Sequence, residues 1–441
     1  MSEKKNVPKL RFPEFTEPWE QRKLGEISDK VTKKNQDVVV DEVFTNSAEY
    51  GIISQRDFFD KDIANTENID GYYVVEPNDF VYNPRISTTA PFGPIKRNKL
   101  ERSGAMSPLY YVFRPNNVDL SYLEWFFQTS CWYPFMRFNG NSGARSDRFA
   151  ITDKIFNEMP ISLPQDIEEQ KRIGMFLTTL DTLITLHQRK LDHVKDLKKS
   201  MLQKMFPKNG QLYPEVRFPE FTDAWEQRKW IDTVDISTEM VDPTSGEYDD
   251  MPHIAPGNIE SFTGRILDNV KTVKEEQLIS GKFRFRPNDV VYGKINPQLG
   301  KYFYSCVNGL TSADAYVFNG KHGITQKFLF ALLQTSDFFK YSVSVSKRSG
   351  MPKINRDELN AYVFLAPREE EQDKIGSFLL NIDHLITLHQ RKLGAINLTN
   401  AIVLFDNGYN PALACELIIL KGVLTYAKHH YQKQHVILRL L

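Results

Sequence analysis

Hydrophobic residues recur at alternating four- and three-residue steps in two segments, which predicts two long helices with a heptad seam. The first series is Ile173, Leu177, Leu180, Ile184, His187, Leu191, Val194, Met201 and Met205, with Lys198 as the one polar step. The second series is Ile375, Leu379, Ile382, Ile386, His389, Leu393 and Ile396. Phe176 and Leu183 make the first stripe wider than one partner helix needs. Acidic residues follow Pro164 and Pro367, where the dipole of each new helix favours them.

The regions before the two helices have a mixed pattern. Residues 72–75 and 110–113 read as strands, and Pro77-Asn78-Asp79 reads as a turn that leads into a strand at 80–82. Short amphipathic helices are expected at 123–127 and 328–333. Each region is therefore predicted to be a compact α+β domain.

The chain is an internal duplication. Residues 8–24 (PKLRFPEFTEPWEQRKL) and 214–230 (PEVRFPEFTDAWEQRKW) agree at 12 of 17 positions. Residues 168–191 and 370–393 agree at 17 of 24 positions and share the letters EEQ, IG and LITLHQRKL. The residues between these blocks differ greatly. One fold with two different interiors suggests two related sites that recognise different things.

Connectivity then sets the expected architecture. Because one domain lies between the two helices in the chain, helices that pair along their seams must be antiparallel. The predicted fold is α+β, with two tandem domains spaced by an antiparallel coiled coil and related by a pseudo-twofold axis. The expected boundaries are 1–165 and 208–367 for the domains, 166–207 and 368–404 for the helices, and 405–441 for a tail.

Composition narrows the class of protein. The 56 lysines and arginines balance 56 aspartates and glutamates, so a DNA-binding surface requires that charge be segregated. Three distant cysteines, Cys131, Cys306 and Cys415, argue against a disulfide framework and fit a reducing cytoplasm. The start of the chain has no apolar secretory core. The most apolar stretch, 411–427, is too short and too broken by charge for a membrane span.

This organisation resembles the specificity subunit of Type I restriction-modification enzymes. The resemblance runs from about Val7 to Leu393 and rests on the paired RFPEF and WEQRK segments, the paired EEQ, IG and HQRKL helices, and the two dissimilar interiors. It implies that each interior is a target-recognition domain that reads one half of a split sequence in double-stranded DNA. It also implies a helical spacer, two methyltransferase subunits bound to the frame, and a motor-endonuclease subunit recruited to the complex.

The candidate DNA contacts are polar, basic loops at equivalent places in the two interiors, because Arg and Lys reach phosphate or guanine and Asn and Gln read adenine. The first interior contributes Asn83, Arg85, Ser87, Thr88, Lys96, Arg97, Asn141, Ser142, Arg145 and Arg148. The second contributes Lys294, Asn296, Gln298, Lys301, Lys347, Arg348, Lys353 and Asn355. The competing interpretation of each is a solvated surface loop. Tyr110 and Phe113 are expected in the core rather than stacked on bases.

No catalytic residue, cofactor or metal is expected. The sequence has no G-x-x-x-x-G-K-[ST] phosphate loop, and its Asn83-Pro84-Arg85 and Asn296-Pro297-Gln298 segments do not match the Pro-Pro-aromatic loop of an amino-methyltransferase. Asp79 and Asp289 fit turn chemistry better than a nuclease site. His187 and His389 fit buried residues that set helix register better than metal ligands.

The second helix departs from the first after Leu393. The block MLQKMF, which ends the first helix, has no counterpart after Gly394, so the end of the second helix and its contacts are in question. Two other functions stay open. The chain is also compatible with the specificity portion of a single-chain restriction-methylation enzyme, detached from its catalytic half, or with a coiled-coil scaffold that binds no DNA.

Overall fold

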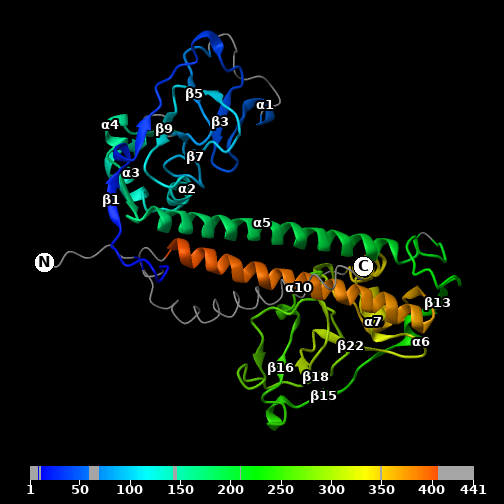
Figure 1. Cartoon of the computed structure of the whole chain (residues 1–441). Coiled ribbons are helices and arrows are strands. Elements are labelled where there is room, and N and C mark those ends of the chain that lie inside the picture. Colours follow the sequence, from blue (N-terminus) through cyan, green and yellow to red (C-terminus); the bar gives the residue numbers. More distant parts are fainter. Residues whose placement is uncertain are drawn as a thin grey trace. The chain divides into compact units, whose positions relative to one another are not determined.

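The computed structural model describes residues 8, 11–58, 69–142, 147–208, 210–347 and 350–405. The chain divides into two compact units, Met1–Thr185 with Ala395–Leu441, and Leu186–Gly394. Each unit combines one α+β domain with parts of two long helices, α5 (Ile167–Lys204) and α10 (Glu369–Phe405) (Figure 1). The tail beyond Phe405, which includes the apolar stretch 411–427, lies outside the described residues. Within the described ranges, no helix is both long enough and apolar enough to cross a membrane.

The domain of unit 1 alternates short strands with short helices. Its strands are β1 (Glu20–Lys23), β2 (Ser28–Lys30), β3 (Phe44–Ser47), β4 (Gly51–Ser54), β5 (Tyr73–Val75), β6 (Phe80–Tyr82), β7 (Ile95–Arg97), β8 (Gly104–Met106), β9 (Tyr111–Pro115), β10 (Asn141–Ser142), β11 (Phe149–Ala150) and β12 (Pro160–Leu163). Its helices are α1 (Gln55–Phe58), α2 (Leu120–Gln128), α3 (Tyr133–Asn139) and α4 (Asp153–Phe156).

The domain of unit 2 follows the same plan. Its strands are β13 (Glu226–Lys229), β14 (Val234–Ile236), β15 (Met240–Val241), β16 (Pro252–His253), β17 (Lys271–Thr272), β18 (Lys282–Phe285), β19 (Val290–Gly293), β20 (Tyr302–Tyr304), β21 (Gly309–Thr311), β22 (Ala315–Gly320) and β23 (Val363–Ala366). Its helices are α6 (Trp230–Thr233), α7 (Gln326–Leu333), α8 (Ser336–Val345) and α9 (Arg356–Asn360).

The two units repeat one sheet topology. A four-stranded antiparallel sheet has the order β2-β9-β6-β7 in unit 1 and β14-β22-β19-β20 in unit 2. The repeated WEQRK segments form β1 and β13, which pair with β12 and β23, the strands directly before the long helices. The repeated segments thus form the same strand pairing in both units. The α+β class expected from the sequence is confirmed.

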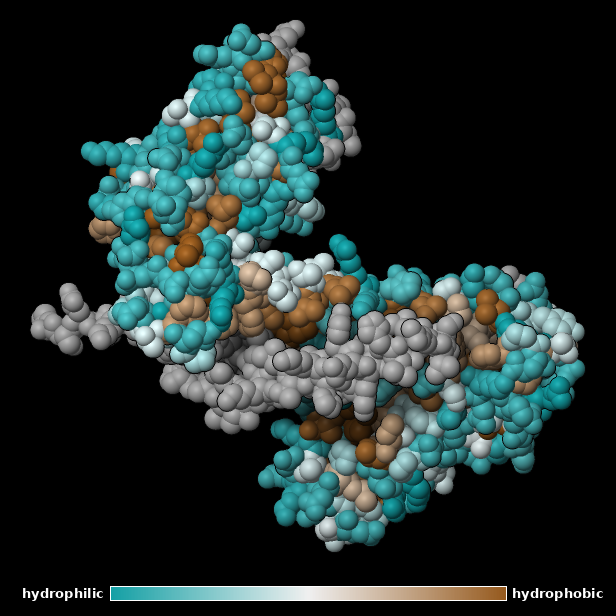
Figure 2. All heavy atoms as spheres, viewed as in Figure 1, coloured by the Kyte–Doolittle hydropathy of each residue, from teal (hydrophilic) through white to brown (hydrophobic). Residues whose placement is uncertain are grey.

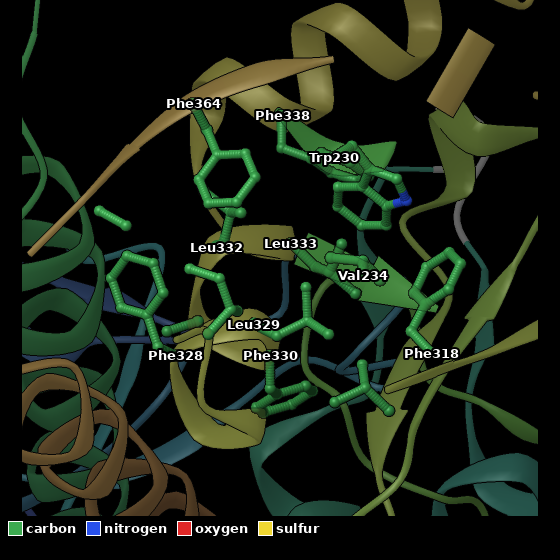
Figure 3. Close-up of a cluster of buried hydrophobic side chains, with 14 of the residues drawn as sticks. Trp230, Val234, Phe318, Phe328, Leu329, Phe330, Leu332, Leu333, Phe338 and Phe364 are labelled. Carbon is green, nitrogen blue, oxygen red and sulfur yellow. The ribbon is translucent and has the colours of Figure 1, made fainter. Parts of the chain in front are cut away.

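The core of unit 2 is built around α7, nearly all of whose apolar side chains are buried. Figure 3 shows Phe328, Leu329 and Leu332 of this helix packed among side chains from other elements, including Trp230 and Phe364. The same cluster reaches Ile375 and Leu379 of α10, so the domain core and the base of the long helix are continuous. In unit 1, Tyr111 and Phe113 of β9 are buried in the equivalent cluster.

The two Pro-Asn-Asp segments are turns, as expected. Asn78 and Asn288 have left-handed φ angles of 73° and 74°. The Asp79 carboxylate accepts hydrogen bonds from the Glu76 backbone N–H at 2.7 Å and from Arg114 Nε at 2.7 Å. The Asp289 carboxylate accepts from the Arg286 backbone N–H at 2.8 Å. Both aspartates therefore stabilise turns.

A buried ion pair joins each RFPEF segment to the first turn of a long helix. In unit 1, Arg11 donates to both oxygens of Glu169 at 2.7 and 2.8 Å. In unit 2, Arg217 donates to both oxygens of Glu371 at 2.8 Å each. Glu169 is 0% exposed and Glu371 is 1% exposed, so each carboxylate depends on its arginine for compensation of its charge.

The next residues of the repeated helix motif attach the domain. Gln170 Oε1 accepts from the Asp119 N–H at 2.9 Å, at the start of α2, and Gln372 Oε1 accepts from the Thr325 N–H at 3.0 Å, at the start of α7. A Cβ atom on Gly376 would lie 2.4 Å from Lys327 Cβ, so glycine permits the close approach of α7. We call each set of arginine, glutamate, glutamine and glycine the helix–domain joint. Unit 1 completes its joint with Gly174, where a Cβ would lie 2.7 Å from Ser121 Cβ.

Within unit 2, the second half of α5 packs antiparallel against the first half of α10 (Figure 1). Leu191 is buried with Ile382 and Ile386, and the predicted polar step, Lys198, forms an ion pair with Asp383 further along the seam. His187 faces His389, its counterpart in the other repeat, with ring centroids 5.7 Å apart. Within this unit these contacts lie along the predicted seam and run in the antiparallel direction.

Removing the arginine of the joint is expected to destabilise unit 2 strongly. Arg217→Ala leaves the Glu371 carboxylate buried without a partner, which costs roughly 3–5 kcal/mol of unfolding free energy. Arg368→Ala is the matched control, because Arg368 pairs with Asp223 at the surface and such pairs contribute about 0–1 kcal/mol. Denaturant unfolding of the full chain measures both. Equal losses in the two variants would contradict the joint.

The paired histidines are expected to make stability depend on pH. Burial lowers the pKa of both imidazoles, and the charges of Lys190 and Lys392 lower it further. The unfolded ring has a pKa of about 6.5, so stability is fully present above that pH and is lost as the pH falls towards the lower folded pKa. The double variant His187→Leu/His389→Leu should therefore show a smaller fall in melting temperature between pH 7 and pH 5. His193→Leu, at an exposed site on α5, should behave like the parent chain; no difference between the two variants would refute this role.

Candidate nucleic-acid interface

The two candidate loops of the first domain lie side by side. The Ile86 N–H donates to the Asp147 carbonyl at 3.0 Å, and the Phe149 N–H donates to the Pro84 carbonyl at 2.8 Å. These bonds place Arg85 directly opposite Arg148 in an antiparallel bridge. Both arginines are exposed. Residues opposed in this way have Cβ atoms about 5 Å apart, where like charges repel, so the pair favours an anion between them.

The candidate loops of the second domain meet in the same way. The Asn296 N–H donates to the Pro352 carbonyl at 2.7 Å, and the Ile354 N–H donates to the Lys294 carbonyl at 3.1 Å. Ile295 thereby lies opposite Lys353. The structure thus brings together, in both repeats, two loops that are about 50 residues or more apart in the sequence.

Two cationic residues, Lys294 and Arg356, lie beside Tyr316 in the second domain, and Lys353 acts on Lys294 through its charge. Lys294 Nζ lies 5.0 Å from the ring centroid, and Arg356 Cζ lies 5.9 Å from it. The pKa of Lys294 is lowered, first by burial and then by the charges of Lys353 and Arg356, although Asp314 opposes this. This concentration of positive charge is suited to phosphate or to the acceptor edge of guanine.

Sequence reasoning did not single out Arg356. The residue lies at the first position of α9, directly after the predicted Asn355. Its guanidinium lies beside the Tyr316 ring and donates to the Ile236 and Ser237 carbonyls at 3.4 and 3.3 Å, and these contacts are set by the fold rather than by local sequence. The one signal that the sequence offered is that Arg356 directly follows the predicted contacts Lys353 and Asn355.

Several of the predicted residues have structural partners. Asn83 donates to the Asn46 carbonyl at 2.8 Å and accepts from the Arg85 N–H at 2.9 Å, so it shapes its own loop. Asn355 caps α9 by accepting from the Glu358 N–H at 2.9 Å. Lys301 donates to the Ile259 carbonyl. Each of these three side chains therefore has a structural role.

Two predicted residues of the first domain lie apart from the loop pair. Lys96 and Arg97 belong to β7, which packs against α2. Arg97 approaches Glu124 of α2 at 3.6 Å, and burial lowers the pKa of Lys96. The structure therefore does not group them with Arg85 and Arg148.

The remaining predicted residues lie on or beside the loops. Ser87 and Thr88 are exposed on the first loop, where the Ser87 hydroxyl accepts from the Ala90 N–H at 3.1 Å, and Asn141 and Ser142 form β10. Gln298 donates to Asn296 Oδ1 at 3.2 Å, and Lys347 is exposed after α8. Arg145 and Arg348 lie outside the described residues.

Hydrophobic side chains also reach the surface of the frame. Along α5, Met175 and Leu183 are exposed in unit 1, and Leu186 and Leu197 are exposed in unit 2. Figure 2 shows hydrophobic residues at the surface along the course of this helix, within a mainly hydrophilic exterior. Of the second apolar row expected on this helix, Leu183 is exposed, whereas the Phe176 ring packs edge-on against Phe12.

Comparison with known proteins identifies a family and a fold. The family described as "Type I restriction modification DNA specificity domain" matches residues 16–196 and 223–398. The chain is 26% identical over 290 residues to the Type I restriction enzyme EcoDI specificity subunit of Escherichia coli, covering 60% of this chain and 63% of that protein. It is 25% identical over 264 residues to the MjaVIII specificity subunit of Methanocaldococcus jannaschii, covering 55% of this chain and 59% of that protein.

The matched region therefore spans less than two thirds of these curated relatives. Among solved structures, the Type I restriction-modification S subunit from M. genitalium matches with a TM-score of 0.56 and 10% identity. That match covers 92% of this chain and 99% of the other, and it supports the fold.

Proposed function

We propose that this chain, which belongs to the family of Type I restriction-modification DNA specificity domains, is the non-catalytic DNA-reading subunit of a Type I restriction-modification complex. Each α+β domain reads one half of a bipartite target, and the long helices set the distance between the halves. The observation that carries this proposal is the pair of joined loops in each domain. In the first domain Arg85 lies opposite Arg148; in the second, Lys353 lies opposite Ile295, and Lys294 and Arg356 lie beside Tyr316.

The loops fit DNA for a physical reason. An exposed Arg–Arg pair is destabilising by itself, and phosphate oxygens relieve it. Arginine and lysine also donate to guanine O6 and N7 in the major groove. Because the two interiors differ in sequence while their frames match, the same fold presents different side chains at its two loop pairs. We infer that the two half-sites differ in sequence.

The exposed apolar row of α5 fits the surface of a partner protein. We infer that two methyltransferase subunits bind the frame, one at each repeat, and that a motor-endonuclease subunit joins this assembly. The complex then acts in the cytoplasm, where its DNA substrate lies.

The two alternatives differ from this proposal in what accompanies the chain. A detached specificity portion of a single-chain enzyme predicts an in-frame catalytic domain beside it in the genome, whereas a separate subunit predicts a neighbouring methyltransferase gene. A scaffold that binds no DNA predicts no salt-sensitive DNA binding, whereas a DNA-reading subunit requires it, because phosphate contacts release counterions.

Neutralising the arginine pair is expected to weaken DNA binding. Methylome sequencing of a host that carries this chain and its methyltransferase first identifies the target. The double variant Arg85→Ala/Arg148→Ala should then lower the affinity for target DNA by tenfold or more. The slope of log K against log salt should fall by about 1 for each phosphate contact removed. Arg22→Ala, at a surface pair with Glu26, should leave both quantities unchanged. Unaltered affinity and slope in the double variant would remove this loop pair from the interface.

Exchange of one interior should change one half-site alone. Replacing residues 25–166 with the interior of a relative leaves the first WEQRK segment, the long helix α5 and the second domain unchanged. The methylome should then show a new first half-site, with the second half-site unchanged. A simultaneous change in both half-sites would contradict independent reading domains.

A further inference from the structure

A pocket of about 360 Å³ lies within unit 2, between the long helices and the second α+β domain. One wall consists of residues from α5 and α10, and the other comes from residues 262–265, Tyr302 and the junction of α7 with α8. Its volume is within the range of roughly 300–1,000 Å³ typical of small-molecule sites. The pocket is separate from the loop pairs, so its occupant does not depend on the proposed DNA interface.

The rim of the pocket carries an aromatic side chain held in a strained conformation. Phe262 has a φ of 63° and remains 52% exposed. Its N–H donates to the Gly300 carbonyl at 2.8 Å, and its ring packs edge-on against Phe339 with centroids 5.4 Å apart. A bulky residue rarely has a positive φ, and such strain concentrates at ligand sites. The exposed face of this ring offers a surface on which a flat ring can stack.

Positive charge exceeds negative charge around the pocket. Four cationic residues, Lys195, Lys198, Lys199 and Arg265, line it. Two carboxylates face them: Asp383 forms an ion pair with Lys198, and Glu260 forms one with Arg265 at 3.1 Å. Lys195 and Lys199, which are exposed, supply the surplus charge at the rim. An anionic group on the ligand would be attracted there.

Two residues that line the pocket, Gln334 and Asp383, have acceptors that lack donors. Gln334 Oε1 and Asp383 Oδ2 are buried and have no hydrogen-bond partner, although Lys198 pairs with the other oxygen of Asp383. Tyr302 is buried in the same pocket. Burial raises the pKa of its phenol, and the charge of Asp383 raises it further. A buried acceptor without a partner destabilises the pocket as it stands, so a ligand with N–H donors gains by entering.

From these four features we propose that the pocket binds a mononucleotide whose base carries an amino group. The base stacks on Phe262 and its amino group donates to Gln334 and Asp383, while the phosphate binds Lys195 and Lys199. A bare phosphate leaves the aromatic wall and the two acceptors unused. A cationic ligand is repelled by the surplus lysines, and a fatty acid has no donor for the acceptors.

Isothermal titration of the full chain with AMP, GMP, CMP and UMP tests the proposal. The three nucleotides with amino groups should bind, and UMP should bind at least tenfold more weakly because it has no exocyclic amino donor. Ribose 5-phosphate should bind weakly as well. Bound AMP should also raise the melting temperature of the chain, since it binds the folded state alone.

Two variants separate binding from folding. Lys199→Ala, at an exposed site, should weaken AMP binding about tenfold, the loss of one charge-assisted contact. Phe262→Ala should weaken AMP binding without weakening ribose 5-phosphate binding. Lys190→Ala is the matched control on the same helix outside the pocket, and it should bind AMP like the parent chain. No AMP binding at millimolar concentration, equal binding of AMP and ribose 5-phosphate, or unchanged binding in Lys199→Ala would overturn the proposal.

Discussion

The rest of each unit depends on one buried ion pair between an arginine of the RFPEF segment and a glutamate in the first turn of a long helix. Because the carboxylates of Glu169 and Glu371 are almost fully buried, neither is tolerated without its bidentate partner. The adjacent glutamine binds the start of the next domain helix, and the glycine one turn later lets that helix approach closely. These contacts explain why the two repeats agree at these letters and differ elsewhere.

A fixed joint leaves the interior of each domain free to vary. The sheet β2-β9-β6-β7 and its counterpart β14-β22-β19-β20 keep the same order, while the loops at their edges carry Arg85 and Arg148 in one unit and Lys294, Lys353 and Arg356 in the other. Charge is therefore concentrated at equivalent places by different residues. This arrangement reconciles a net charge of zero with a surface suited to an anionic partner.

The antiparallel seam in unit 2 contains polar residues at defined positions. Lys198 pairs with Asp383, and His187 meets its own repeat counterpart, His389. Lys198 in an apolar seam favours the register in which it meets Asp383, because any shift would bury it unpaired. The residue that corresponds to Lys198 in the second repeat is Asn400, so the duplication does not supply a lysine for Asp181. The two repeats therefore differ in this residue as well as in their interiors.

The sequence by itself determined the repeat, the α+β class, the two helices and the turn role of Asp79 and Asp289, because these follow from internal identity, periodicity and local backbone chemistry. It also located the loops around Arg85 and Arg148. Only the tertiary structure decided that these two loops join, that Arg97 faces Glu124 instead, and that Arg356 reaches Tyr316. It alone brought Phe262, Gln334 and Asp383 to one pocket. Contacts between residues far apart in the chain depend on how elements pack, and one sequence contains no local pattern that records them.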